Sequence, residues 1–403
     1  MNNGIQKLTY LDGLRGVAAL IVVVSHFVQL FYPALFSLRE DQSHYEWELL
    51  IGSTPLNIFY NGNFAVCIFF VLSGFVLSYQ YFQQKKRTTL ISGASKRYLR
   101  LAIPVFVSVL LVYGLMMANA FHVQHLSSYT FSTIGNYTDS DQLDVFTMIK
   151  TALIDLFFLY DSSYNPVLWT MTYELLGSFM VFLFLAFFGN AKQEYRFIMY
   201  VILTLVFIES YYLAFILGMF LCDLYHHARG RFNLRIHVIL WLLAVGLYLG
   251  SYPYSNANLT IHQFITFSGA PFNQFQFYHI IAAFILMYVM VASPGLQSFF
   301  SKRMPLFLGE ISFSLYLLHF TILTSLSSYV FEVLILQFPY HISFVITVLI
   351  SMPVMILGSS IMSRYVDQKA MRWSSQLYHE LLGQKLEAKQ QKNQRVRVKM
   401  YEL

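Results

Sequence analysis

The first apolar segment, residues 12–33, most constrains how this chain can fold. The segment is long enough to cross a bilayer, which takes about 20 apolar residues, yet it carries Asp12, Arg15 and His26. An ionisable side chain at membrane depth costs about 2.5–3.5 kcal/mol on insertion scales, so such residues usually face a protein-lined interior and serve a function there. The segment therefore predicts a membrane helix that borders an internal cavity.

Arg15 and His26 are predicted to share one face of this helix. They are eleven positions apart, so at about 100° per residue their side chains point about 20° apart and lie about 16 Å apart along the axis. A permanently charged guanidinium then lies near the first turns, and a titratable imidazole lies near mid-membrane. We expect both groups to line one internal chamber.

The rest of the chain has the composition of a membrane protein. Of its 403 residues, 57% are hydrophobic and only 11% are charged, whereas soluble domains carry about 25% charged residues. The sequence predicts an all-α polytopic membrane protein with about ten transmembrane helices around a central cavity. The expected spans are 12–33, 57–82, 97–119, 167–188, 196–209, 210–227, 236–252, 276–293, 307–332 and 342–366. The stretch 147–160 is short for a crossing, and we expect it to be re-entrant or to lie on the surface.

The charge distribution orients these spans. Basic residues fill the connections after the second and sixth spans and precede the ninth, whereas 34–56 and 120–146 are acidic and 253–275 has no lysine or arginine. The positive-inside rule therefore places both termini in the cytoplasm. We expect residues 1–368 to form the membrane domain and residues 369–403 to form a basic cytoplasmic tail.

Two kinds of partner are not expected. The formal charge of +6 follows from cytoplasmic anchoring and from the tail, so no nucleic-acid partner is predicted. Cys67 and Cys222 lie in apolar segments and form no spaced framework. His226 and His227 lack a third ligand, and we predict no metal site.

Further polar residues interrupt the later spans. Arg97 and Arg100 are three apart at the start of the third span, where they are either positive-inside anchors or a clamp for phosphates. Glu174 lies about 10 Å inside the fourth span, counted from its outer end. No lysine or arginine shares its helix, so it is either protonated or paired with another helix, in a structural or a functional role.

His319 is expected at mid-depth in the ninth span, level with His26. A lone histidine inside a membrane is often a packing residue. Two histidines at one depth, together with Glu174 on a span that enters the membrane from the opposite side, favour a functional site over a packing role.

Motifs along nearly the whole chain together resemble the acyltransferase-3 family of integral membrane O-acyltransferases. The resemblance covers about residues 8–368 and rests on the run 11–16 with His26, the segment 70–75, the Arg97, Arg100 and Pro104 stretch, Leu168 and Trp169 with Glu174, and Gly309 through Ser312, Tyr316, Leu317 and His319. Two features depart from the family pattern. The acidic-Lys-Pro ending appears as Asp367-Gln-Lys369 without the proline, and the sequence contains no secreted esterase-like domain such as some members append.

The resemblance implies transfer of an acyl group, commonly acetyl from acetyl-CoA, to a hydroxyl of a surface glycan, lipopolysaccharide, peptidoglycan or secreted metabolite. It further implies a carbohydrate or glycolipid acceptor and an integral protein of a bacterial inner membrane. Arg15, His26 and the Tyr316-Leu317-x-His319 pattern match residues that recur in the family.

The side chains suit this chemistry in their own right. His26 is expected to act as general base toward a sugar hydroxyl, because its unperturbed pKa lies near 6.5. Arg15, with Arg97 and Arg100, is expected to hold the phosphates or pantetheine carbonyls of acetyl-CoA. Glu174 is expected to orient an imidazole or bind acceptor hydroxyls. His319 is expected to stabilise an oxyanion or share a proton relay, and an acyl-histidine intermediate is an open alternative.

Two other classes of function compete with an enzyme. A transporter of a lipid-linked sugar or small metabolite would use the same interior charges, although the sequence shows no inverted repeat. A catalytically inactive scaffold would tolerate loss of His26, whereas an enzyme would not.

Overall fold

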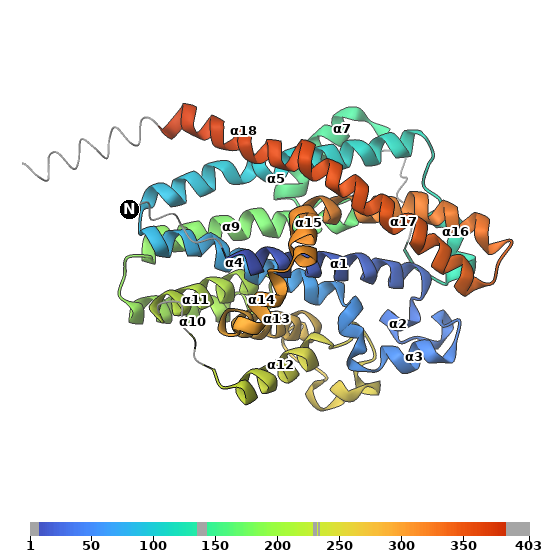
Figure 1. The fold of residues 1–403 in the computed structure, drawn as a ribbon, viewed down its shortest axis with the longest axis horizontal. Coiled ribbons are helices and arrows are strands. Elements are labelled where there is room, and N and C mark those ends of the chain that lie inside the picture. The colour runs from blue at the N-terminus through green and yellow to red at the C-terminus, as the bar shows by residue number, and fades with distance from the viewer. Residues whose placement is uncertain (1–7, 135–142, 229–231, 233, 384–403) are drawn as a thin grey trace, which may run out of the picture.

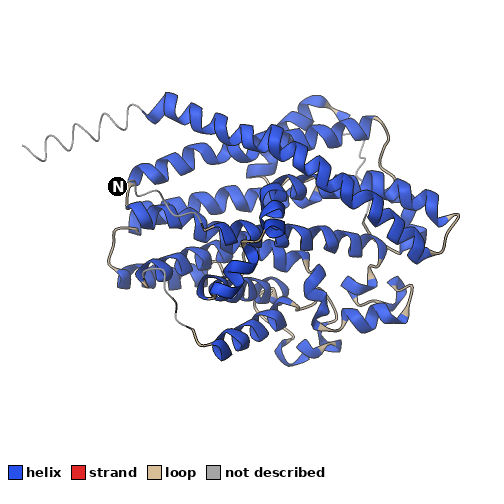
Figure 2. Cartoon of the chain, viewed as in Figure 1, coloured by secondary structure: helices blue, strands red, loops and turns tan. Residues whose placement is uncertain are grey.

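The computed structural model describes residues 8–134, 143–228, 232 and 234–383. Every regular element in that part of the chain is a helix (Figure 2). Seven of the described helices are long and apolar enough to cross a membrane, which confirms the predicted all-helical membrane architecture. They are α1 (Thr9–Phe31), α4 (Gly62–Gln84), α5 (Arg87–Met117), α9 (Trp169–Phe188), α13 (Gln274–Ala292), α15 (Arg303–Ile322) and α17 (Tyr340–Met362).

Shorter helices occupy the other three predicted spans. They are α10 (Gln193–Val206), α11 (Tyr212–His227) and α12 (Ile236–Gly250), of 14, 16 and 15 residues. Each is shorter than the roughly 20 residues of a full apolar crossing. The ten predicted spans therefore correspond to seven long apolar helices and three shorter ones.

Short helices fill the connections between the long ones. The segment 147–160 lies in α7 (Val145–Lys150), a π turn (Thr151–Asp155) and α8 (Leu156–Phe158), and it is not among the seven long helices. It packs on its neighbours, since the Tyr98 hydroxyl of α5 donates to the Leu153 carbonyl at 2.6 Å. The remaining short helices are α2 (Ala34–Ser37), α3 (Glu46–Gly52), α6 (Ser127–Thr130) and α14 (Pro294–Phe300).

Two of the long helices continue beyond a π turn (Figure 1). α15 runs through the π turn Leu323–Ser327 into α16 (Ser328–Ile335). α17 runs through the π turn Ser363–Asp367 into α18 (Gln368–Tyr378) and on to Gly383. The domain boundary predicted at residue 368 falls within this helix, and residues 384–403 of the predicted tail lie outside the described residues.

Small residues set the closest helix contacts. A Cβ added to Gly16 of α1 would meet the Gly309 nitrogen of α15 at 2.3 Å, and one added to Gly309 would meet the Asp12 carbonyl oxygen at 2.2 Å. The two backbones thus pass in direct contact beside Arg15, as small residues allow in membranes. α4 and α11 meet in the same way, because a Cβ on Gly74 would lie 2.2 Å from the Phe215 carbonyl oxygen.

One buried ion pair fixes α10 against α11. Arg196 donates to both carboxylate oxygens of Asp223, from Nε at 2.7 Å and from Nη2 at 2.8 Å. The Tyr200 hydroxyl donates to the same carboxylate at 3.3 Å. The planar guanidinium is thereby held in the bidentate geometry that carboxylates favour, so this charge on a predicted span is structural.

Candidate functional site

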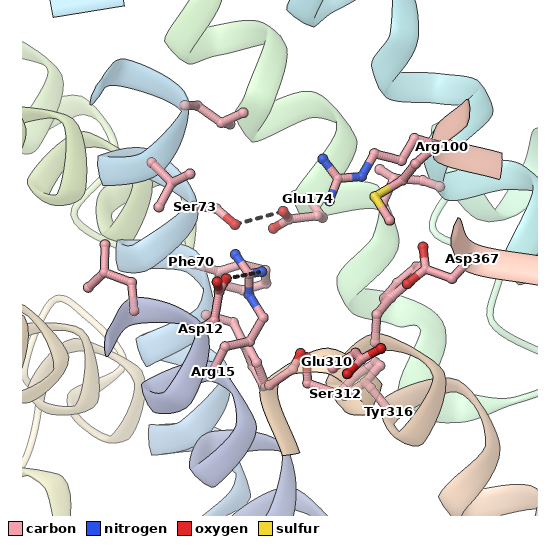
Figure 3. Close-up of a pocket in the computed structure, with 18 of the residues that line it drawn as sticks. Asp12, Arg15, Phe70, Ser73, Arg100, Glu174, Glu310, Ser312, Tyr316 and Asp367 are labelled. Atoms are coloured by element: carbon pink, nitrogen blue, oxygen red, sulfur yellow. Dashed lines mark hydrogen bonds and ion pairs between the residues drawn. The ribbon is translucent and has the colours of Figure 1, made fainter. Parts of the chain in front are cut away.

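A cavity of about 840 Å³ opens between α1, α4, α5, α9, α15 and the C-terminal helix (Figure 3). Its volume is in the range typical of small-molecule sites, about 300–1,000 Å³. Aromatic side chains such as Phe69 and Phe70 form much of its wall. The charged residues that line it are Asp12, Arg15, Arg97, Arg100, Glu174, Glu310 and Asp367. The predicted cationic residues therefore do meet at one site, but four carboxylates accompany the three arginines.

Arg97 and Glu174 form an ion pair on the cavity wall. Nη2 of Arg97 contacts Oε1 of Glu174, and Nε of Arg97 donates to the Ser178 hydroxyl at 2.7 Å. The Ser73 hydroxyl of α4 donates to the same Glu174 oxygen at 2.7 Å (Figure 3). Glu174 has no lysine or arginine on its own helix and is paired instead with an arginine of α5. The guanidinium of Arg97 is occupied by Glu174 and Ser178, both on α9. It therefore holds Glu174 in place and is not available to a ligand.

The guanidiniums of Arg15 and Arg100 have fewer protein contacts than that of Arg97. Nη1 of Arg15 lies 3.8 Å from Oδ1 of Asp12, and both side chains are 30% exposed. Arg100 is exposed, and none of the ion pairs among the described residues includes it. Asp367 lies on the same cavity wall. These two guanidiniums are the cations best placed to meet an anionic ligand.

His26 of α1 and His319 of α15 are in direct contact. Nε2 of His319 lies 3.2 Å from Nδ1 of His26, and the ring centroids are 5.0 Å apart. The equal depth predicted from the sequence brings the two rings together. Both therefore face the α1–α15 interface rather than lipid.

Backbone carbonyls select the tautomer of each ring. Nδ1 of His319 lies 3.0 Å from the Leu315 oxygen, and Nδ1 of His26 lies 2.9 Å from the Val22 oxygen. A carbonyl only accepts, so in the neutral pair each Nδ1 carries the proton. Nε2 of His319 then accepts from His26, and Nε2 of His26 keeps its lone pair. That nitrogen is in the state a general base requires.

Tyr316 borders both the cavity and the histidine pair. Arg15 lines the cavity and His26 does not, whereas Tyr316 lines it and its ring centroid lies 5.8 Å from that of His319. The Tyr316 hydroxyl donates to the Val167 carbonyl at 2.5 Å. The single chamber expected along α1 thus includes Arg15 but not the imidazole of His26.

Several cavity residues were not predicted as site residues. They are Ser73, Glu310, Asp367 and Gln368. Gln368 donates to Glu310 at 3.3 Å. The rule that singled out Arg15, an ionisable group bordering an apolar span, applies equally to Asp367.

The chain was compared with known proteins. Residues 8–364 match the family described as acyltransferase domain. The chain is 24% identical to the O-acetyltransferase PaAT-1 of Phomopsis amygdali over an alignment of 431 positions, which covers 94% of this chain and 86% of that relative. No solved structure matches the chain.

Proposed function

This chain belongs to the acyltransferase family that its residues 8–364 match, and on that premise we propose which donor and acceptor it uses. The protein is a membrane-embedded acyltransferase. The proposed donor is an acyl-CoA, with acetyl as the default acyl group, and the proposed acceptor is a hydroxyl of a cell-surface or exported carbohydrate. The observation that carries the proposal is a cavity that holds Arg15, loosely paired with Asp12, and Arg100, beside a histidine pair in which Nε2 of His26 keeps its lone pair.

Arg15 and Arg100 are the proposed contacts for the phosphates of the donor. Each guanidinium offers a fork of N–H donors that suits phosphate oxygens. Arg97, predicted as a third contact, is instead the partner of Glu174.

His26 is the proposed general base. Its Nε2 takes the proton of the acceptor hydroxyl as the oxygen attacks the thioester carbonyl; the C–O bond forms, the C–S bond breaks, and the same proton passes to the leaving thiolate. A positioned base of this kind contributes about 10²- to 10⁴-fold. His319 accepts a hydrogen bond from His26 and so holds the reactive tautomer. Tyr316 lines the cavity and contacts His319, so the thioester passes its ring on the way to His26.

A carbohydrate acceptor is supported by the aromatic residues beyond the outer end of α1. Trp47 of α3 is 38% exposed, and its ring lies 6.2 Å from that of Tyr45 in a stacked arrangement. Tyr60 and Tyr252 are buried, which leaves Trp47 and Tyr45 to offer the stacking surface that sugars use. We further propose a bacterial inner membrane with cytoplasmic termini, in keeping with the distribution of basic residues.

The test is acceptor-dependent release of free thiol from acetyl-CoA by membranes that contain the protein. We expect release with the wild type, none with His26→Ala, and a large loss with Arg15→Lys, which keeps the charge but not the planar fork. The surface glycan of a deletion strain, compared by proton NMR with the complemented strain, should lack an O-acyl methyl signal. A transporter would move its substrate without releasing thiol, and equal release by wild type and His26→Ala would overturn the assignment of the base.

A further inference from the structure

Two histidines and a glutamate meet where the turn that follows α5 lies against α16. His122 directly precedes a 3₁₀ turn (Val123–Leu126), His125 lies within that turn, and Glu332 lies on α16. Nδ1 of His122 lies 3.0 Å from one carboxylate oxygen of Glu332, and Nδ1 of His125 lies 3.0 Å from the other. The ligand atoms of the three residues all lie within 4.8 Å of one another.

We propose that His122, His125 and Glu332 bind a divalent transition-metal ion, with Zn²⁺ as the best fit. Two imidazoles and a carboxylate form a three-protein-ligand set that zinc accepts, with water in the fourth position. Zinc–nitrogen and zinc–oxygen bonds of about 2.0–2.2 Å place tetrahedral ligand atoms about 3.4 Å apart. The ligand atoms of the three side chains lie within 4.8 Å of one another, so side-chain rotations that bring them closer by up to about 1.4 Å complete the site.

Solvent reaches this cluster from the outer side. The side chains of His122, His125 and Glu332 are 28%, 54% and 31% exposed, so an ion enters without opening the fold. In the metal-free state the two Nδ1–H groups donate to the carboxylate. An ion bound at the two Nδ1 atoms takes the place of these hydrogen bonds, and each imidazole, which must be neutral to bind a metal, then carries its proton on Nε2.

The proposed metal would tie an outer loop to the helix that carries His319. α15, the π turn Leu323–Ser327 and α16 form one continuous helix, and Glu332 lies on its outer part. The His122 backbone N–H already donates to the Thr324 carbonyl at 3.2 Å, within that π turn. A bound ion would therefore stiffen the outer end of the catalytic helix, about 20 Å along the axis from His319.

Sequence spacing alone does not reveal this set. His122 and His125 supply two ligands, and the third follows 207 positions after His125. The spacing of residues along the chain therefore shows only two of the three ligands.

The experiment uses the full chain, purified in detergent through a tag without histidine, stripped with EDTA and dialysed against ZnCl₂. Zinc content is measured by mass spectrometry, and thermal unfolding is recorded with and without zinc. We expect one zinc per chain in the wild type, and a higher unfolding temperature with zinc because the ion binds the folded state. His125→Ala and Glu332→Gln should weaken zinc binding more than about 100-fold, since even outer-shell changes cost 10- to 100-fold.

His237→Ala is the matched control, because His237 is an exposed histidine at the start of α12 outside the cluster, and it should bind zinc as the wild type does. His125→Cys supplies a thiolate, another zinc ligand, and should restore binding. If His125→Ala does not fold, Glu332→Gln, which keeps the side-chain shape, decides the question. Equal zinc content in wild type, Glu332→Gln and His125→Ala, or none in the wild type, would overturn the proposal.

Discussion

Replacing Arg97 with alanine should destabilise the fold by about 3–5 kcal/mol, because it leaves the buried carboxylate of Glu174 without its cation. The Arg97 side chain is 9% exposed and that of Glu174 is 16% exposed, so water compensates little. The change also removes the 2.7 Å hydrogen bond to Ser178. A loss of 3–5 kcal/mol lowers the ratio of folded to unfolded protein by about 10²- to 10⁴-fold.

A double-mutant cycle measures this pair. The free energy of unfolding is determined in mixed micelles for the wild type, Arg97→Ala, Glu174→Gln and the double variant. Glu174→Gln should cost less than Arg97→Ala, because the neutral amide oxygen still accepts from Ser73. The double variant should be more stable than Arg97→Ala alone, with a coupling energy of about 0.5–3 kcal/mol.

The competing role for Arg97, a clamp for donor phosphates, gives a different result. A clamp residue would change the KM for acyl-CoA with little effect on unfolding. A destabilisation by Arg97→Ala below about 1 kcal/mol, or strictly additive effects in the cycle, would refute the structural role argued here.

Other substitutions test the rest of the site. Arg100→Ala should raise the KM for acyl-CoA by about 10- to 100-fold with kcat nearly unchanged, since a charge-assisted hydrogen bond contributes about 1.5–3 kcal/mol; steady-state kinetics measure this. His319→Ala should lower kcat by about 10- to 100-fold at constant KM, part of the 10²- to 10⁴-fold that the base supplies, because His26 loses its partner; a change in KM alone would contradict this. Gly309→Ala should destabilise by about 1–3 kcal/mol, whereas Gly114→Ala, with nothing within 4 Å of its added Cβ, should not, as thermal unfolding can show.

Helical periodicity predicted what lies on one face of one regular helix. The all-helical membrane fold follows from composition, and the 3.6-residue repeat brings Arg15 and His26 to the side of α1 that faces α15. His319 meets His26 because both spans start near the same membrane face and each histidine lies at mid-depth. These inferences need only residue spacing and the thickness of a bilayer.

Residue spacing along one helix does not predict which side chains of different helices meet. The sequence left Glu174 with an unnamed partner and Arg97 with two candidate roles, and the structure joins the two at a contact 77 positions apart. Tyr316 was placed on a motif, but its position beside both the cavity and the histidines depends on the distance between α15 and α9, which no local pattern encodes. The carboxylates of Glu310 and Asp367 were missed for the same reason.

The π turns explain why Asp367 in particular escapes prediction. A π turn adds one residue to a helical turn, so every side chain after it is rotated by about 100° relative to an unbroken α-helix. The turn Ser363–Asp367 interrupts the helix just where the C-terminal segment passes the cavity, and it is fixed by the Ser363 hydroxyl, which donates to the Glu310 carbonyl of α15 at 3.0 Å. An unbroken helical pattern carried on from residues 342–366 therefore misplaces the side chains that follow this turn. The contact that selects the turn comes from another helix, so the face that Asp367 presents is a property of the packed bundle and not of its own segment.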